Sequence, residues 1–90
     1  MKRNHIYVSG LVQGVYFRHN TMLHAEMLGI KGWVRNLRDG RVEIVCEGND
    51  ESVDKFTAWC NIGPRGAYVE GLDIEQEEFK NEFNKFQILY

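Results

Sequence analysis

The spacing of apolar residues along this chain switches between the two-residue period of strands and the 3.6-residue period of helices. Alternation predicts strands at 5–12, 31–36, 41–47 and 67–75, with a short last strand at 86–90, and helical spacing predicts helices at 18–28 and 50–61. This order is the split βαβ pattern, for which the right-handed crossover rule leaves few topologies. It predicts an α+β, ferredoxin-like sandwich with both helices on one face of an antiparallel-rich mixed sheet.

Length and charge restrict the class of protein further. The 90 residues suffice for one hydrophobic core, so residues 1–90 are expected to form a single domain. A formal net charge of −2, with acids and bases interspersed, disfavours binding to nucleic acid. No stretch has the apolar length of a membrane span, and the N-terminal residues do not resemble a signal peptide. We therefore expect a cytoplasmic protein, monomeric, with no membrane partner.

The cysteines and histidines do not form a metal or redox motif. Cys46 and Cys60 lack CxxC spacing and have no histidine cluster beside them, so both are interpreted as reduced core residues. His19 and His24 are five residues apart rather than four, and no carboxylate stands at ligand spacing. The prediction is no metal and no cofactor.

Periodicity also assigns side chains to the two faces of the sheet. On the strand at 41–47, Cys46 is expected to point inward, whereas Glu43 and Glu47 are expected to point toward water. Both helices should cover one face through apolar stripes. The other face should be open to solvent and could bind a partner; the residues expected there are Tyr7, Ser9, Leu11, Trp33 and Val45.

The stretch from Gly10 to Arg18, GLVQGVYFR, has the composition of an anion site. A strand enters a turn that needs Gly14, and an arginine stands where the next helix begins. Free N–H groups at a helix N-terminus favour phosphate or carboxylate, and a guanidinium adds a two-pronged donor. The stretch lacks the Lys-Ser/Thr pair of a Walker loop and the glycine spacing of a dinucleotide fingerprint. By generic spacing alone, a strand-turn-helix corner with a surface arginine is the more common interpretation.

This stretch resembles the first signature of the acylphosphatase family. The segment from Gly32 to Gly48, GWVRNLRDGRVEIVCEG, resembles the second signature, and Gly63-Pro64 falls where the family has the same pair. The resemblance implies a small ferredoxin-like enzyme that hydrolyses acyl phosphates without a metal. It implies that Arg18 binds phosphate and that Asn36 orients water. Tyr16 departs from the glycine that is frequent at its position in microbial members, which puts the substrate fit in question.

The predicted topology agrees with this assignment. The first two long strands should be parallel with the third between them, so the loop before Arg18 and the turn after Asn36 should emerge at one end of the sheet. The expected ligands of this site are then the acyl phosphate substrate and, as a product-like anion, inorganic phosphate or sulfate. The loop expected to hold the phosphoryl oxygens comprises Leu11, Val12, Gln13, Gly14, Val15, Tyr16 and Arg18.

Some assignments at this end keep a second interpretation. Asn36 could simply form the hairpin turn, a common role for asparagine. Arg35, Arg38 and Arg41 could attract an anionic substrate or form a solvated charged rim.

Two other functions share the predicted strand order. One is a catalytically silent anion-binding module, as found at the start of larger carbamoyl-transferring hydrogenase-maturation proteins; the presence of both expected catalytic residues, and an end at Tyr90 without zinc-type cysteines, count against it. The other is an RNA-recognition module, which would need an aromatic-rich strand motif and a basic surface. Hydrolysis of acyl phosphates therefore remains the leading prediction.

Overall fold

The computed structural model describes residues 1–90 and has the predicted order of elements. Each strand and helix lies within a few residues of its predicted range. The elements are β1 (Lys2–Leu11), α1 (Phe17–Met27), β2 (Lys31–Asn36), β3 (Val42–Gly48), α2 (Asp50–Cys60), β4 (Tyr68–Glu77) and β5 (Phe86–Leu89).

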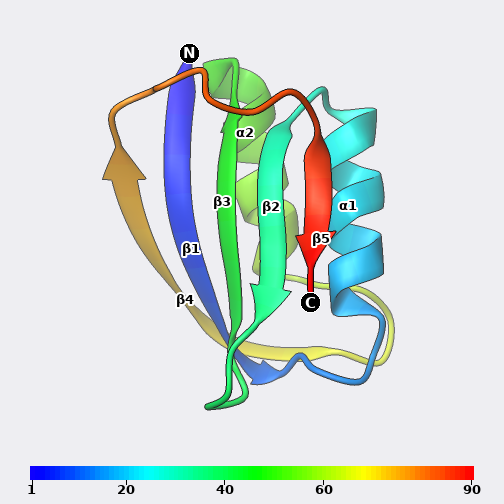
Figure 1. Cartoon of the computed structure of the whole chain (residues 1–90). Helices are drawn as coiled ribbons and strands as arrows, with labels where there is room; N and C mark the ends of the chain where they lie inside the picture. The colour runs from blue at the N-terminus through cyan, green and yellow to red at the C-terminus, as the bar shows by residue number, and fades with distance from the viewer.

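The five strands form one sheet in the order β4-β1-β3-β2-β5 (Figure 1). Both β1 and β2 pair antiparallel with β3, so they run parallel to each other, as predicted. β5 pairs parallel with β2, with Gly32 opposite Phe86 and Arg35 opposite Leu89. The end of β1, the end of β2, the end of β5 and the start of α1 consequently meet at one end of the sheet (Figure 1).

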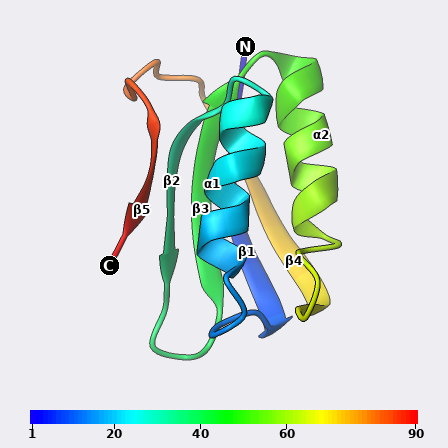
Figure 2. The ribbon, with the colours of Figure 1, turned by 90° about the vertical axis from the view of Figure 1, so that its right-hand side faces the viewer.

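Both helices lie on the same face of the sheet, as the side view shows (Figure 2). α1 buries Phe17, Thr21 and Ala25, which recur at helical spacing and face the sheet. Asn49 is the N-cap of α2, and its side chain accepts a hydrogen bond from the backbone N–H of Ser52 at 2.9 Å. The apolar side chains buried between the helices and the sheet form most of the core, and the hydrophobic effect stabilises it. The largest fully buried side chains are Phe17, Phe56, Ile6 and Ile44.

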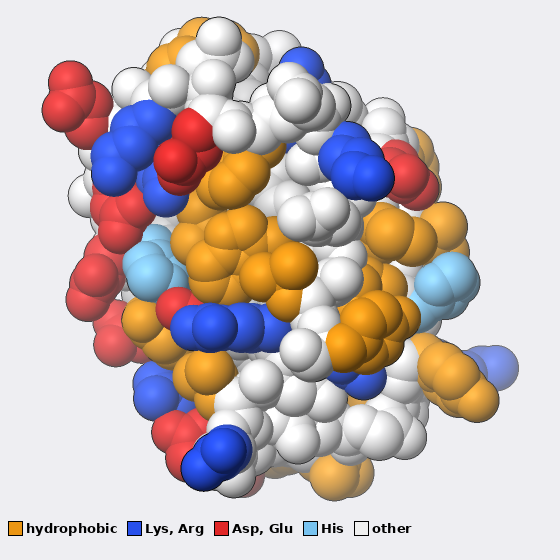
Figure 3. Space-filling view, in the orientation of Figure 1, with side chains coloured by type: hydrophobic (Ala, Val, Ile, Leu, Met, Phe, Trp, Pro, Cys, Tyr) orange, Lys and Arg blue, Asp and Glu red, His pale blue; other side chains and the backbone are white.

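The other face of the sheet is more covered than predicted. Residues 78–85, here called the strap, connect β4 at one edge to β5 at the other and cross one end of this face (Figure 1). Glu43 and Glu47, expected to point toward water, are only 4% and 3% exposed, so that prediction was wrong. Val45 is also buried rather than open to solvent. Hydrophobic side chains gather in the middle of this face, with basic and acidic groups around them (Figure 3).

Ion pairs explain how carboxylates can be buried beneath the strap. Glu47 accepts hydrogen bonds from the backbone N–H groups of Lys80, Asn81 and Glu82, and from Arg3 at 3.2 Å. Burial alone would raise the pKa of Glu47, but these donors outweigh it and hold the pKa below its ordinary value. The carboxylate thus fixes the strap to the sheet.

Cys46 and Cys60 are both buried and free, as the sequence predicted. Burial raises the pKa of the Cys46 thiol to about 12, which keeps it protonated and unreactive. None of the helices has the length and apolar character needed to cross a membrane.

Candidate active site

A pocket of about 460 Å³ opens at the end of the sheet where β1, β2, β5 and α1 meet. Both Arg18 and Asn36 contribute to its wall, so the structure brings together the two residues that the sequence singled out. The complete wall consists of Val12, Gly14, Tyr16, Phe17, Arg18, His19, Asn36, Ile88 and Tyr90.

The loop between β1 and α1 presents backbone N–H groups without acceptors. None of the N–H groups from Gln13 to His19 donates a hydrogen bond to another group of the protein. Gly14 has φ +76° and Tyr16 has φ 59°, so two residues of the loop adopt the left-handed backbone conformation before the helix begins. Successive free N–H groups in such turns, followed by a helix N-terminus, create a positive potential that favours an anion.

Tyr16 shows why glycine suits this position. A non-glycine residue with positive φ is uncommon because the Cβ atom crowds the backbone. Its side chain is exposed and forms part of the pocket rim, so the tyrosine changes the mouth of the pocket and not its floor.

Gln13 fastens the loop to the hairpin between β2 and β3. Its amide nitrogen donates to the backbone carbonyls of Leu37 at 2.7 Å and Arg41 at 2.9 Å. These bonds join the loop that carries Arg18 to the strand end that carries Asn36. The Gln13 side chain thus positions the loop, while its backbone N–H, predicted to bind phosphate, donates to no group of the protein.

Arg18 lies in the first turn of α1 and forms no ion pair with any carboxylate. Its guanidinium carbon is 4.9 Å from the centroid of the Tyr90 ring. The side chain therefore keeps a full positive charge at the pocket. An unneutralised guanidinium beside free N–H groups is well suited to bind phosphate oxygens.

Asn36 is the last residue of β2, and its side chain forms no hydrogen bond within the protein. Its amide oxygen Oδ1 is buried and unpaired. The hairpin turn is closed without it, because the N–H of Leu37 donates to the carbonyl of Arg41 at 2.8 Å and Asp39 accepts from the N–H of Arg41 at 3.0 Å. A buried polar atom without a partner is costly, so the turn-forming role does not account for this side chain.

The remaining residues predicted for this end have different positions. Leu11 is 60% exposed, and Val15 packs against the core, so neither lines the pocket. Arg35 pairs with Glu43, and Arg41 pairs with Asp39, which neutralises both. Arg38 is exposed and has no ion pair. The rim interpretation therefore fits Arg35 and Arg41.

Sequence reasoning missed four pocket residues: Phe17, His19, Ile88 and Tyr90. Phe17 and His19 flank Arg18 and could have been found from that position alone. Ile88 and Tyr90 reach the pocket only because β5 pairs parallel with β2, and strand alternation does not reveal which strand a short segment will join.

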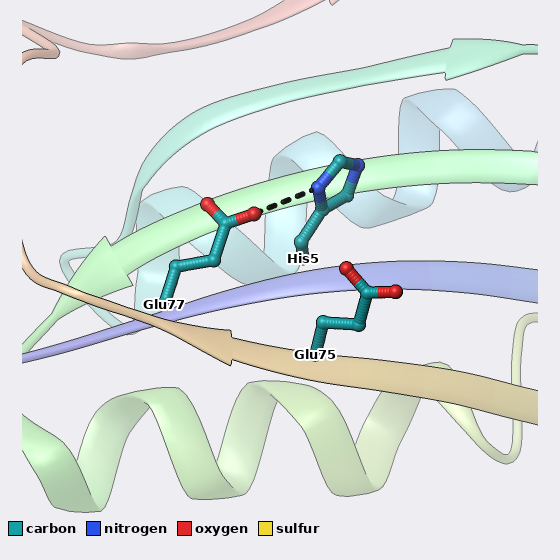
Figure 4. Close-up of side chains that lie close together, drawn as sticks. All are labelled: His5, Glu75 and Glu77. Atoms are coloured by element: carbon teal, nitrogen blue, oxygen red, sulfur yellow. Dashed lines mark hydrogen bonds and ion pairs between the residues drawn. The ribbon is translucent and has the colours of Figure 1, made fainter.

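A second group of titratable side chains lies on the strap-covered face. Ligand atoms of His5, Glu75 and Glu77 are within 4.8 Å of one another, close enough to hold a cation (Figure 4). However, both ring nitrogens of His5 face carboxylates, Nδ1 at 3.1 Å from Glu77 and Nε2 at 2.6 Å from Glu43. Burial would lower the pKa of His5, but the two carboxylates outweigh burial and raise it. The carboxylates thus favour the protonated form of His5, and both of its ring nitrogens already have partners in this group.

Fold and pocket together define a ferredoxin-like protein with a pocket at one end of its sheet, whose unpaired N–H groups and arginine are suited to an anion. The sequence profile of the Acylphosphatase family matches residues 4–88. The chain is 52% identical to an acylphosphatase of Methylococcus capsulatus over 99% of this chain and 97% of that protein. The chain therefore belongs to the acylphosphatase family, a family of hydrolases.

Solved structures agree with this membership. The crystal structure of acylphosphatase from Bacillus subtilis superposes with a TM-score of 0.96 and 32% identity, and the alignment covers all of both chains. An acylphosphatase structure from Coxiella burnetii gives a TM-score of 0.93 and 36% identity over 98% of this chain and 92% of that one. The ferredoxin-like fold predicted from the sequence is confirmed.

Proposed function

We propose that this protein hydrolyses the carboxyl–phosphate bond of acyl phosphates to a carboxylate and inorganic phosphate, with Arg18 binding the phosphoryl group and Asn36 orienting the attacking water. The observation that carries the proposal is the gathering of three kinds of unpaired polar group at one pocket. These are the N–H groups of Gly14 and residues 16–19, the Arg18 guanidinium without a carboxylate, and the Asn36 side-chain amide without a partner in the protein.

The phosphoryl group has three oxygens that need donors. The loop N–H groups and the guanidinium fork supply them, and they are positioned before the substrate arrives because Gln13 ties the loop to the hairpin. Preorganised donors stabilise the charge on the equatorial oxygens of the transition state at little reorganisation cost. Inorganic phosphate, as product, should use the same donors.

Asn36 has the chemistry to place the water. Its side-chain amide offers both an acceptor and donors, so it can hold one water with a lone pair of the water oxygen directed toward phosphorus. The water oxygen forms the new P–O bond as the bond to the carboxylate oxygen breaks, and the departing carboxylate takes that bonding pair. A phosphoryl oxygen accepts the proton of the water. Because a carboxylate is a good leaving group, positioning and charge stabilisation are the main tasks.

The first experiment measures phosphate release from benzoyl phosphate in the presence of a metal chelator. Turnover that the chelator leaves unchanged is expected, because the donors named above are protein groups. A protein that bound phosphate but released none from benzoyl phosphate would be the silent anion-binding module instead.

The Asn36→Ala variant separates binding from chemistry. Turnover should fall by about 100-fold or more, because the water loses its orientation. The inhibition constant of inorganic phosphate should change only a few-fold, since the charge attraction at Arg18 remains. Asn36→Asp should be equally inactive and should bind phosphate more weakly, because it adds a like charge. A destabilised Asn36→Ala protein with normal turnover per folded molecule would eliminate the water-orienting role.

A further inference from the structure

β5 supplies the pocket with an aromatic side chain that the chemistry above does not use. Register places Arg35 opposite Leu89, so Tyr90 follows beside the end of β2, where Asn36 is located. Tyr90 lines the pocket, and its ring lies against the Arg18 guanidinium with 4.9 Å between the guanidinium carbon and the ring centroid. Its exposed fraction of 99% means that it contributes no core packing.

Arginine-on-ring contacts recur in this protein, and the comparison among them is informative. Three of the four arginines concerned also pair with a carboxylate, and Arg18 is the exception. The four contacts are Arg3 with Phe83, Arg18 with Tyr90, Arg35 with Trp33 and Arg41 with Tyr7.

The absence of a carboxylate has a physical consequence for Arg18. A carboxylate would orient the guanidinium, but it would occupy N–H donors and cancel the charge that attracts phosphate. An aromatic ring attracts the guanidinium through its face, and the N–H groups lie in the guanidinium plane, so they stay free. The ring can thus restrict the arginine side chain while all of its N–H donors remain free to bind phosphate.

We infer that Tyr90 is a positioning residue for Arg18: its ring holds the guanidinium at the pocket with its charge and donors available to the phosphoryl group. This inference rests on the proposed role of Arg18 in phosphate binding. An exposed contact of this kind changes an equilibrium by about two- to five-fold. Tyr90 therefore adjusts phosphate affinity, whereas Arg18 determines it.

The test uses the full chain and inorganic phosphate, titrated while the amide NMR signal of Gly14 is followed. Tyr90→Leu should raise the dissociation constant of phosphate about two- to five-fold and lower kcat/KM for benzoyl phosphate by a similar factor. Tyr90→Phe keeps the ring and should remain close to the parent protein. Tyr68→Leu, the same change at an exposed tyrosine outside the pocket, is the matched control.

The Arg18→Ala background shows whether Tyr90 acts through Arg18. There, adding Tyr90→Leu should leave phosphate affinity unchanged, because the group that the ring positions is gone. The same loss in both backgrounds, or an unchanged affinity for Tyr90→Leu alone, would overturn the inference while leaving the proposed function intact. If Arg18→Ala alone did not weaken phosphate binding, the proposed function would fail, and this inference would fail with it.

Discussion

Arg3 and Arg18 belong to opposite ends of the same sheet and differ in what surrounds them. Arg3 is 7% exposed and pairs with Glu47 at 3.2 Å, Glu77 at 2.8 Å and Glu82. Arg18 has no carboxylate partner and faces a pocket. An arginine whose charge is neutralised by carboxylates has a structural role. An arginine at a pocket that keeps its charge without a carboxylate partner is available to bind an anion.

The largest effect should come from replacing Arg3. Arg3→Ala leaves the Glu47 carboxylate buried without its charged partner, and breaking a buried pair in this way costs about 3–5 kcal/mol of folding stability. Urea unfolding measures the loss, and turnover per folded molecule should stay normal. Arg38→Ala, at an exposed arginine without an ion pair, should change stability little and serves as control. If Arg3→Ala were as stable as the parent protein, the interpretation of Arg3 as a structural arginine would be wrong.

Arg18→Ala should show the opposite pattern. Losing the unpaired charge at the pocket should reduce transition-state stabilisation by roughly 3 kcal/mol, which lowers turnover of benzoyl phosphate more than 100-fold. The melting temperature should stay near that of the parent, since no ion pair is broken. Arg18→Lys should rescue poorly because a point charge does not reproduce the guanidinium fork. Full activity in the alanine variant would show that the site was assigned to the wrong residue.

Acid should weaken the Arg3 end in a graded way. The hydrogen bonds from Arg3 and His5 lower the pKa of Glu77, and the backbone N–H of Lys80 together with Arg3 lowers that of Glu47. A carboxyl with a lowered pKa contributes stability that is complete above its ordinary pKa of about 4.3 and is lost as pH falls through the folded-state value. Urea midpoints should therefore fall below about pH 4, and Arg3→Ala should flatten this dependence. If the urea midpoint of Arg3→Ala fell as steeply with pH, Arg3 would not be the group that lowers the pKa of these carboxyls.

Phosphate or sulfate should give the smallest effect, and only through the Arg18 end. At ten times its dissociation constant, a ligand that binds only the folded state adds about 1.4 kcal/mol of stability. Thermal melting in increasing sulfate should show this gain in the parent protein and in Arg3→Ala. The gain should be lost in Arg18→Ala, and stabilisation retained there would place the anion elsewhere.

How much the sequence could predict depended on which interaction decided each feature. Strand and helix periods gave the order of elements, and the crossover rule gave parallel β1 and β2, which placed Arg18 and Asn36 at one end. Alternation also placed Glu43 and Glu47 on the correct face of β3. It could not show that the strap would cover Glu47 or that His5 and Arg35 would pair with Glu43, because both depend on contacts between segments separated in the chain.

Prediction of the pocket wall was limited for the same reason. The resemblance identified Arg18 and Asn36, but their unpaired state is visible only once every possible partner has a position. Tyr90 was missed because a four-residue strand carries little information about which neighbour it joins. The tying role of Gln13 was missed for a related reason, since its acceptors are backbone carbonyls that no sequence pattern reveals.

The parallel pairing of β5 with β2 also bears on how the protein acquires activity as it folds. Gly32 pairs with Phe86, and Arg3 pairs with Glu77, so the sheet forms only when segments far apart in the chain meet. Such non-local pairing slows folding, because the entropy of closing long loops is lost before the contacts form. Since Ile88 and Tyr90 complete the pocket, a refolding molecule should reach full phosphate affinity only after its last strand has docked.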